Sequence, residues 1–217
     1  GCSSTTFAIN NAFSDIASGL AKTILVINPE ISTPAVNFTH RDKHFIFGDG
    51  CAATIIQKDS SSEKSFRILD RKLFTQFSNN IRSNYSYLNR AAIDAKDNDD
   101  LLFHQYGRGV FKDVCPLVAK LISDQLESNN IDPKDISKFW LHQANGKMIR
   151  LITSKILGTD DFDSTIAPMP IINFGNLASV GSLFAFNLDN DLEAGQKGVI
   201  CSFGAGYSVC SLIVEKT

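Results

Sequence analysis

Short, almost purely apolar runs alternate along this chain with stretches of helical periodicity, and this alternation constrains the fold most. The runs occupy residues 23–27, 139–141, 198–202 and 207–214. Apolar runs of this length are typical of strands that are covered on both faces. Residues 110–126 between them carry the apolar stripe of an amphipathic helix. The pattern predicts an α/β fold with substantially parallel strand pairing.

The first residues place a cysteine among small residues, directly before a predicted helix. Phe13, Ile16, Ala17 and Leu20 have the spacing of one buried face of that helix. Backbone N–H groups and the positive dipole end at the first turn of a helix favour a thiolate. Cys2 is therefore a candidate nucleophile, and a buried structural cysteine is the alternative that the residues alone leave open.

Composition excludes several classes of protein. The chain has 217 residues, is 43% hydrophobic and carries a net charge of −2, which argues against general binding to nucleic acid or to an acidic membrane. Five cysteines without a CxxC pair disfavour a zinc site or a disulfide framework, and we expect no metal. The absence of a secretory signal and of a run long enough to span a membrane predicts a cytoplasmic protein with reduced thiols.

Two further polar residues follow predicted elements. His142 comes at the end of the strand at 139–141, and Asn176 lies in a glycine-containing turn before a helix. Functional groups of α/β proteins gather at such strand ends and helix starts. A capping or surface histidine, a turn asparagine and a simple hairpin at residues 203–206 are the structural alternatives.

Six segments in order resemble one family, β-ketoacyl-acyl carrier protein synthase III. They are residues 1–4 (GCSS), 47–50 (FGDG), 107–112 (GRGVFK), 142–145 (HQAN), 175–176 (GN) and 203–206 (FGAG). Residues 28–31 and 199–207, with the serine-rich start, are most similar to the branch that extends medium-chain acyl groups, the β-ketodecanoyl branch.

The resemblance implies a thiolase fold, with two pseudo-repeated α/β halves in αβαβα layers, and a homodimer. Residues 1–100 would be the remainder of the first half with a connecting excursion, and residues 101–217 the second half. In the family about one hundred residues precede the cysteine. We therefore expect the chain to accompany an N-terminal segment of the same protein.

The resemblance also implies an acyltransferase of fatty acid synthesis. The expected reaction is a decarboxylative Claisen condensation of an acyl-CoA with malonyl-acyl carrier protein. Cys2 would attack the acyl-CoA thioester, with its own N–H and that of Ala205 as the oxyanion hole. His142 and Asn176 would hold the malonyl thioester oxygen, and Phe203 would form an apolar wall beside the cysteine.

Other residues receive binding roles by the same resemblance. Arg41 would stack on the adenine of coenzyme A, with a solvated loop arginine as the alternative. Lys147 and Arg150 would dock the carrier protein, and Gly175 would shape the substrate site. Acyl-CoA and malonyl-acyl carrier protein are substrates, so no cofactor is expected.

Two alternatives remain from the sequence. One is a secondary-metabolite acyltransferase or condensing enzyme on the same scaffold, and the other is a non-catalytic partner subunit of a heteromeric synthase. The presence of all three expected catalytic residues argues against the partner subunit. Acyl chain length, and the choice between primary and secondary metabolism, are left open.

Overall fold

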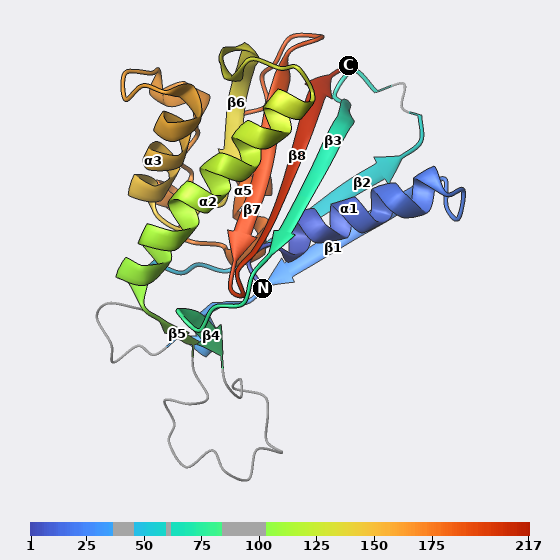
Figure 1. Ribbon diagram of the computed structural model, residues 1–217. Helices are drawn as coiled ribbons and strands as arrows, with labels where there is room; N and C mark the ends of the chain where they lie inside the picture. Colours follow the sequence, from blue (N-terminus) through green and yellow to red (C-terminus); the bar gives the residue numbers. More distant parts are fainter. Residues whose placement is uncertain (37–45, 60–61, 84–102) are drawn as a thin grey trace.

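Helices and strands alternate along the protein, for which a computed structural model describes residues 1–36, 46–59, 62–83 and 103–217 (Figure 1). The helices are α1 (Ser4–Ala17), α2 (Gly107–Ser128), α3 (Gly146–Leu157), α4 (Ile171–Phe174) and α5 (Gly181–Leu188), with the 3-10 turn η5 (Ala178–Val180) before α5. The strands are β1 (Thr23–Glu30), β2 (Gly50–Gln57), β3 (Phe66–Thr75), β4 (Ile81–Ser83), β5 (Phe103–Gln105), β6 (Ile136–Leu141), β7 (Lys197–Gly204) and β8 (Ser208–Lys216).

The main sheet has the strand order β3-β8-β7-β6. Helices α2 and α3 cover one face, while α1 and α5 cover the other, and the β1–β2 ribbon lies beyond α1 (Figure 1). The described residues therefore form four layers in the order helix, sheet, helix, sheet. This order is consistent with the expected layering.

Alternate residues of the main sheet supply two separate apolar cores, as the two-residue period of a strand requires. Phe139, Leu141 and Val199 point toward α2 and α3. Trp140 and Ile200 point the other way and pack with residues of α1, α5 and β2. Because both faces are covered, the runs at residues 139–141, 198–202 and 207–214 are largely apolar, as the sequence predicted, while β3 at the edge of the sheet also carries charged residues.

The prediction of substantially parallel pairing is wrong for the described strands. Only β6 and β7 pair in parallel, whereas β1–β2, β3–β8, β4–β5 and β7–β8 are antiparallel. Three residues join β7 to β8, and so short a link permits a hairpin and not a crossover. The hairpin alternative for residues 203–206 is thus confirmed.

The predicted buried face of the first helix is also wrong. Helix α1 ends at Ala17, so Leu20 lies beyond it and is 78% exposed. The buried residues of α1 are instead Thr5, Thr6, Ile9 and Ala12. Two threonines are buried because their hydroxyls find hydrogen-bond partners, which an apolar pattern does not reveal.

The apolar run at residues 23–27 forms a strand, as predicted, but this strand is covered on one face only. Val26 is buried against the inner layers, while Leu25 and Ile27 are 56% and 58% exposed. Leu25 pairs with Ile55 of β2, which is 66% exposed. The strand also continues beyond the predicted run, to Glu30.

Three other predicted elements are confirmed. Residues 110–126 lie within α2, residues 139–141 within β6, and Asn145 is the N-cap of α3, where its Oδ1 accepts a hydrogen bond from Lys147 N–H. The polar excursion of residues 84–100 lies outside the described residues.

Helix α1 is held against the main sheet by an arginine of β3. The Arg71 guanidinium lies 3.8 Å from the ring centroid of Phe13, and its Nη1 donates to Asn10 O, Asn10 Oδ1 and Ser14 Oγ. Cation–π contact and hydrogen bonding together fix the helix direction. Ser3, the N-cap residue that precedes the helix, is fixed with it.

Gly198 tests the packing of the inner core. A Cβ at this position would lie far inside van der Waals contact with the ring of Trp140, which is fully buried. We expect Gly198→Ala to lower the free energy of unfolding by about 1–3 kcal/mol in urea denaturation. Gly107→Ala is the matched control, because its nearest neighbour would be Gln105 Nε2 at 4.0 Å. Equal stability of both variants would contradict the packing argument.

Candidate active site

Cys2 lies immediately before the N-cap residue Ser3 of α1, and not in the first turn as predicted. Two hydroxyl pairs hold this helix start in place. Ser3 Oγ and Ser208 Oγ of β8 are 2.6 Å apart, and Thr5 Oγ1 donates to Ser179 Oγ of η5 at 2.8 Å. Ser3, Thr5 and Ser179 are all buried, so these bonds join α1 to two other parts of the molecule.

The thiol of Cys2 faces the turn between β7 and β8. Burial raises the pKa of the Cys2 thiol above its ordinary value, and hydrogen bonds from the backbone N–H groups of Cys2 and Ala205 act against that rise. The helix start therefore does not outweigh burial, contrary to the expectation that it favours a resting thiolate. Two N–H donors nevertheless converge on one sulfur, which is the arrangement of an oxyanion hole.

Gly204 permits this approach. A Cβ at this position would lie 2.7 Å from Cys2 Cβ and 2.8 Å from Cys2 N. Separations below about 3 Å are not tolerated between carbon atoms, so a side chain here would displace the cysteine. The turn at residues 203–206 is thus a hairpin, and it also forms one wall of the site.

His142 follows β6, where its backbone N–H donates to Cys201 O of β7 at 2.8 Å. Its side chain is buried, and burial lowers its pKa to about 4, with the Ala178 backbone acting weakly in the other direction. The ring meets that of Phe203 edge to face, with centroids 5.0 Å apart. His142 is therefore a neutral hydrogen-bond donor at pH 7, and not a surface histidine.

Asn176 is oriented by its own turn. Its Oδ1 accepts the Ala178 N–H at 3.0 Å, which directs the amide Nδ2 away from this turn. Gly175 before it has φ of 72°, and a Cβ there would lie 2.9 Å from Ile46 O. Gly48 N–H donates to Asn176 O at 3.0 Å, so the predicted tight approach of residues 47–50 occurs at this asparagine.

A chain of contacts brings the three predicted catalytic residues together. Cys2 contacts Gly204, and the adjacent Phe203 packs on His142. His142 in turn meets the Ala178 backbone that holds Asn176. The thiol, a neutral imidazole and the Asn176 amide therefore share one region where β6, β7, α1 and η5 meet, a convergence that the sequence alone left open.

Asp49 supports the neighbouring loop. Its Oδ1 accepts from the N–H groups of Ser32 and Thr33 at 2.7 and 2.9 Å, and its Oδ2 accepts from Thr33 Oγ1 at 2.6 Å. These bonds, led by the Thr33 hydroxyl, lower the pKa of the Asp49 carboxyl. Arg41, the predicted adenine contact, lies outside the described residues.

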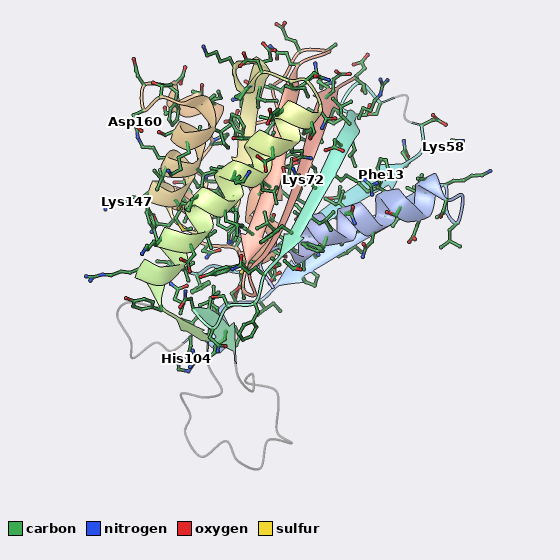
Figure 2. The ribbon with its side chains drawn as sticks, viewed as in Figure 1. Phe13, Lys58, Lys72, His104, Lys147 and Asp160 are labelled. Carbon is green, nitrogen blue, oxygen red and sulfur yellow. The ribbon has the colours of Figure 1, made fainter. Side chains whose placement is uncertain are left out.

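Lys147 and Arg150 differ in their surroundings. Both are exposed on α3, and Figure 2 shows Lys147 on the outer side of that helix. Arg150 Nη2 donates to Asp160 O at 3.1 Å, and its guanidinium lies 5.4 Å from the Phe162 ring centroid. Lys147 is thus the more available cation of the predicted pair.

One supporting residue was missed by sequence reasoning. Gln143 is buried, its Nε2 donates to Leu141 O and Pro168 O, and its Oε1 accepts from Ile171 N–H. It therefore ties the loop before α4 to the end of β6, next to His142. Its place in the HQAN segment could have marked Gln143 as part of the site. Its supporting role could not be predicted, because two of its partners, Pro168 and Ile171, are distant in sequence.

The described part of the chain gives no sign of two other kinds of site. In residues 1–36, 46–59, 62–83 and 103–217, no three His, Cys, Asp or Glu side chains are grouped to hold a metal ion. Within the same ranges, none of the helices has the length and apolar character needed to cross a membrane.

Comparison with known families decides the relationship. Residues 1–76 match the model of 3-oxoacyl-[acyl-carrier-protein] synthase III, and residues 126–216 match the model of the C-terminal part of the same family. The chain belongs to the synthase III family. Over 99% of its length it is 48% identical to the β-ketodecanoyl-[acyl-carrier-protein] synthase of Pseudomonas aeruginosa, of which it covers 62%. It is 29% identical to the β-ketoacyl-[acyl-carrier-protein] synthase III of Chlorobium phaeobacteroides, of which it covers 63%.

The chain thus spans less than two thirds of the length of these synthase III relatives. Solved structures of the family have the same fold. The synthase III of Aquifex aeolicus matches 99% of the chain with a TM-score of 0.80 at 23% identity, and the chain covers 64% of it. The enzyme of Thermus thermophilus matches 100% of the chain with a TM-score of 0.82 at 22% identity, and 66% of it is covered. The protein therefore has a thiolase-like fold.

Gly204 provides a test of the oxyanion hole. In Gly204→Ala the new methyl displaces the Cys2 backbone, so the two N–H groups no longer converge. Loss of one such donor lowers rates by about 10²–10³-fold, and we expect this loss in the acylation of Cys2 by an acyl-CoA, measured by rapid quench and mass spectrometry.

Gly146→Ala is the control for that experiment. It adds a methyl at the start of α3, four residues after His142 in the chain, and this methyl would meet only Met169 Sδ, at 3.5 Å, an ordinary contact. We expect its acylation rate to stay within about twofold of the wild type. Equal rates in the two alanine variants would refute the close-approach argument.

The pKa of His142, about 4, predicts how the stability of the protein depends on pH. The unfolded chain takes up a proton near pH 6.5 and the folded protein only near pH 4, so stability falls as the pH decreases through this window. The difference corresponds to about 3 kcal/mol. His142→Gln removes this titration, so the unfolding free energy of the wild type minus that of the variant should fall by about that amount between pH 7 and pH 4. Urea denaturation at each pH measures it, and parallel pH curves would contradict a neutral buried imidazole.

Proposed function

We propose that the protein catalyses the decarboxylative Claisen condensation of an acyl-CoA with malonyl-acyl carrier protein in fatty acid synthesis. One observation carries the proposal: Cys2 lies against Gly204 in the β7–β8 turn, and the adjacent Phe203 packs on a buried, neutral His142 beside the turn that orients Asn176. Membership of the synthase III family supports the same reaction.

In the first half-reaction Cys2 attacks the thioester carbonyl of the acyl-CoA. The carbonyl oxygen becomes an oxyanion, and the N–H groups of Cys2 and Ala205, which lie beside the sulfur, would donate hydrogen bonds to it. Collapse of the intermediate breaks the bond to coenzyme A. The proton of the Cys2 thiol leaves with the coenzyme A thiol, and an acyl-Cys2 thioester remains.

In the second half-reaction malonyl-acyl carrier protein loses carbon dioxide and becomes an enolate. Decarboxylation needs donors aimed at the forming enolate oxygen and no strong base. A neutral His142 and the Asn176 amide satisfy this need without changing their own charge over physiological pH. The enolate carbon attacks the acyl-Cys2 carbonyl, and the Cys2 sulfur is released as the β-ketoacyl-acyl carrier protein forms.

Phe203 fits the loss of a carboxylate. It is buried and meets His142 edge to face. An apolar ring beside the thiol disfavours a charged carboxylate and favours neutral carbon dioxide. Gly175 contributes through its φ of 72°, which lets the chain turn so that Asn176 enters the same region.

The substrate class is proposed from the relatives. The Pseudomonas aeruginosa protein with 48% identity is named a β-ketodecanoyl-[acyl-carrier-protein] synthase, and we infer a medium-chain acyl-CoA as the donor. Exposed Lys147 and its neighbour Arg150 on α3 would attract the acidic carrier protein. Arg41 keeps its predicted role at the coenzyme A adenine. We infer a homodimer in the cytoplasm that uses no cofactor.

The test is covalent labelling of Cys2. Incubation of the protein with octanoyl-CoA should add one octanoyl group, detected by intact mass, and Cys2→Ala should remove the adduct. Cys51→Ala is the matched control, because Cys51 is an exposed cysteine with no role in the proposed steps, and its loss should leave the adduct unchanged. An adduct that persists in Cys2→Ala would sink the mechanism. A preference for acetyl-CoA would overturn only the medium-chain assignment.

A further inference from the structure

The first turns of α2 contain residues 107–112, which carry part of the family resemblance but have no role in the proposed steps. Asp113 follows them directly and points to the β7–β8 turn. Gly109 leaves room there, since a Cβ would lie 2.5 Å from Tyr106 Cδ1 and 3.1 Å from Asn80 Nδ2. The helix start is thus shaped to admit Asn80 beside Asp113.

Three side chains from different parts of the chain form a closed hydrogen-bond network at this point. Tyr207 Oη donates to Asp113 Oδ2 at 3.0 Å. Asn80 Nδ2 donates to the same Oδ2 at 3.0 Å and to Tyr207 Oη at 3.1 Å. The Tyr207 ring is 3% exposed, while its hydroxyl reaches out to Asp113 on the surface, so the bonds of the network lie at the edge of the core.

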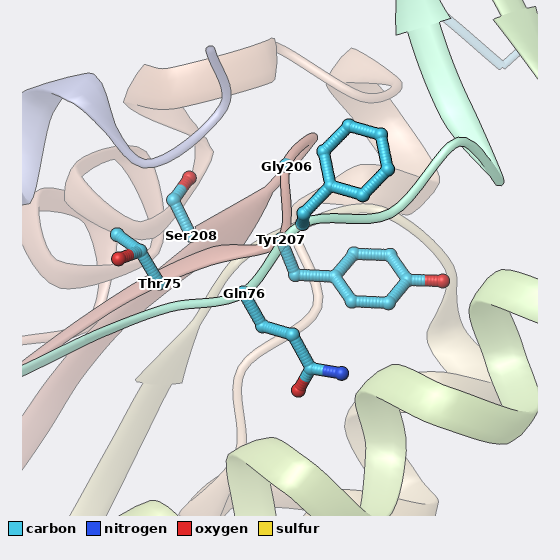
Figure 3. Close-up of a pocket in the computed structure, with 6 residues that line it drawn as sticks. Thr75, Gln76, Gly206, Tyr207 and Ser208 are labelled. Carbon is cyan, nitrogen blue, oxygen red and sulfur yellow. The ribbon is translucent and has the colours of Figure 1, made fainter.

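Tyr207 lies two residues after Ala205, the proposed oxyanion donor. Its carbonyl accepts the Gln76 N–H at 2.8 Å. On the inner side of the turn, Ser208 Oγ donates to Ala205 O at 3.2 Å and pairs with Ser3. Figure 3 shows the Tyr207 ring extending toward α2 while the Ser208 side chain points the opposite way. The turn is therefore held from two sides.

Packing holds this turn only in part. The Tyr207 ring is buried in the core, but a hollow of about 240 Å³ lies beside the turn, lined by residues 75–77 and 206–208 (Figure 3). Next to open space a turn can shift with little loss of packing. Hydrogen bonds from the network therefore add to the packing of Tyr207 in fixing where the turn rests.

We propose that Asp113, Asn80 and Tyr207 are positioning residues that hold the β7–β8 turn with the Ala205 N–H directed at the Cys2 sulfur. The proposal rests on the proposed function for its catalytic consequence, but the geometry can be tested without any substrate. It also gives a structural role to residues 107–112. They form the first turns of α2, which place Asp113 beside Tyr207 of the β7–β8 turn.

The substrate-free test is the pH dependence of Cys2 alkylation by iodoacetamide, followed by peptide mass spectrometry. An N–H donor stabilises the thiolate, so a displaced Ala205 raises the pKa of Cys2 and lowers the thiolate fraction at any pH below it. We expect Tyr207→Phe and Asp113→Ala to move the midpoint to higher pH and to slow alkylation at pH 8 by about threefold or more. Tyr106→Phe is the matched control, since it removes a tyrosine hydroxyl that takes no part in the network, and its profile should equal that of the wild type.

The catalytic readout is the rate of Cys2 acylation by octanoyl-CoA. Both variants should acylate about tenfold more slowly with an unchanged KM, because the network touches the turn and not the substrate. Asp113→Asn keeps a carbonyl oxygen that can accept from Tyr207, so it should restore much of the rate that Asp113→Ala loses.

Each outcome decides a different point. Alkylation profiles of Tyr207→Phe and Asp113→Ala that match Tyr106→Phe would overturn the positioning role. Shifted profiles together with no acylation of the wild type by any acyl-CoA would support the positioning role and overturn the proposed function. Tyr207→Phe retains the buried ring and Asp113 is on the surface, so circular dichroism should show folded variants for both measurements.

Discussion

The close approach of two backbone segments at Cys2 and Gly204 is the constraint on which the site depends. No side chain separates them, and a Cβ on Gly204 would lie 2.7 Å from Cys2 Cβ. This contact places two N–H donors at one sulfur. Two contacts help to keep Cys2 close to Gly204. One is the hydroxyl pair of Ser3 and Ser208, and the other is the contact of Arg71 with Phe13 of α1. A catalytic wall is thus built from backbone, whose donors do not titrate.

Burial acts on the thiol and on the imidazole in different ways. It raises the pKa of Cys2, so the resting nucleophile is a thiol, and it lowers that of His142 to about 4, so the donor is neutral. Both groups are therefore uncharged before substrate arrives. In the proposed reaction, charge would develop only on oxygens that face fixed donors, and such donors stabilise charge most where water is excluded.

The sequence predicted several of the elements better than it predicted how the elements pair. Residues 139–141 and 110–126 could be identified because the spacing of their apolar residues reflects which positions are buried. Pairing direction could not, since the antiparallel partner of β3 is β8, more than a hundred residues away. The buried face of α1 was missed because Thr5 and Thr6 are buried through hydrogen bonds to Ser179 and Ser3, which no periodicity records. Gln143 and the Tyr207 network were missed for the same reason, because their partners meet only in the folded chain.

The pairing of β3 with β8 carries a consequence for how the protein matures. Strand β8 ends at Lys216, and its neighbour Thr217 meets Ser65 through paired hydroxyls 2.5 Å apart. Contacts so distant in sequence form slowly, because a long loop must close first. Among the described elements, β8 comes after all the others in the chain, so the β7–β8 turn cannot form until the ribosome has made them. Cys2 is therefore synthesised long before the turn that carries Ala205. It acquires this neighbour only when β8 has joined the sheet.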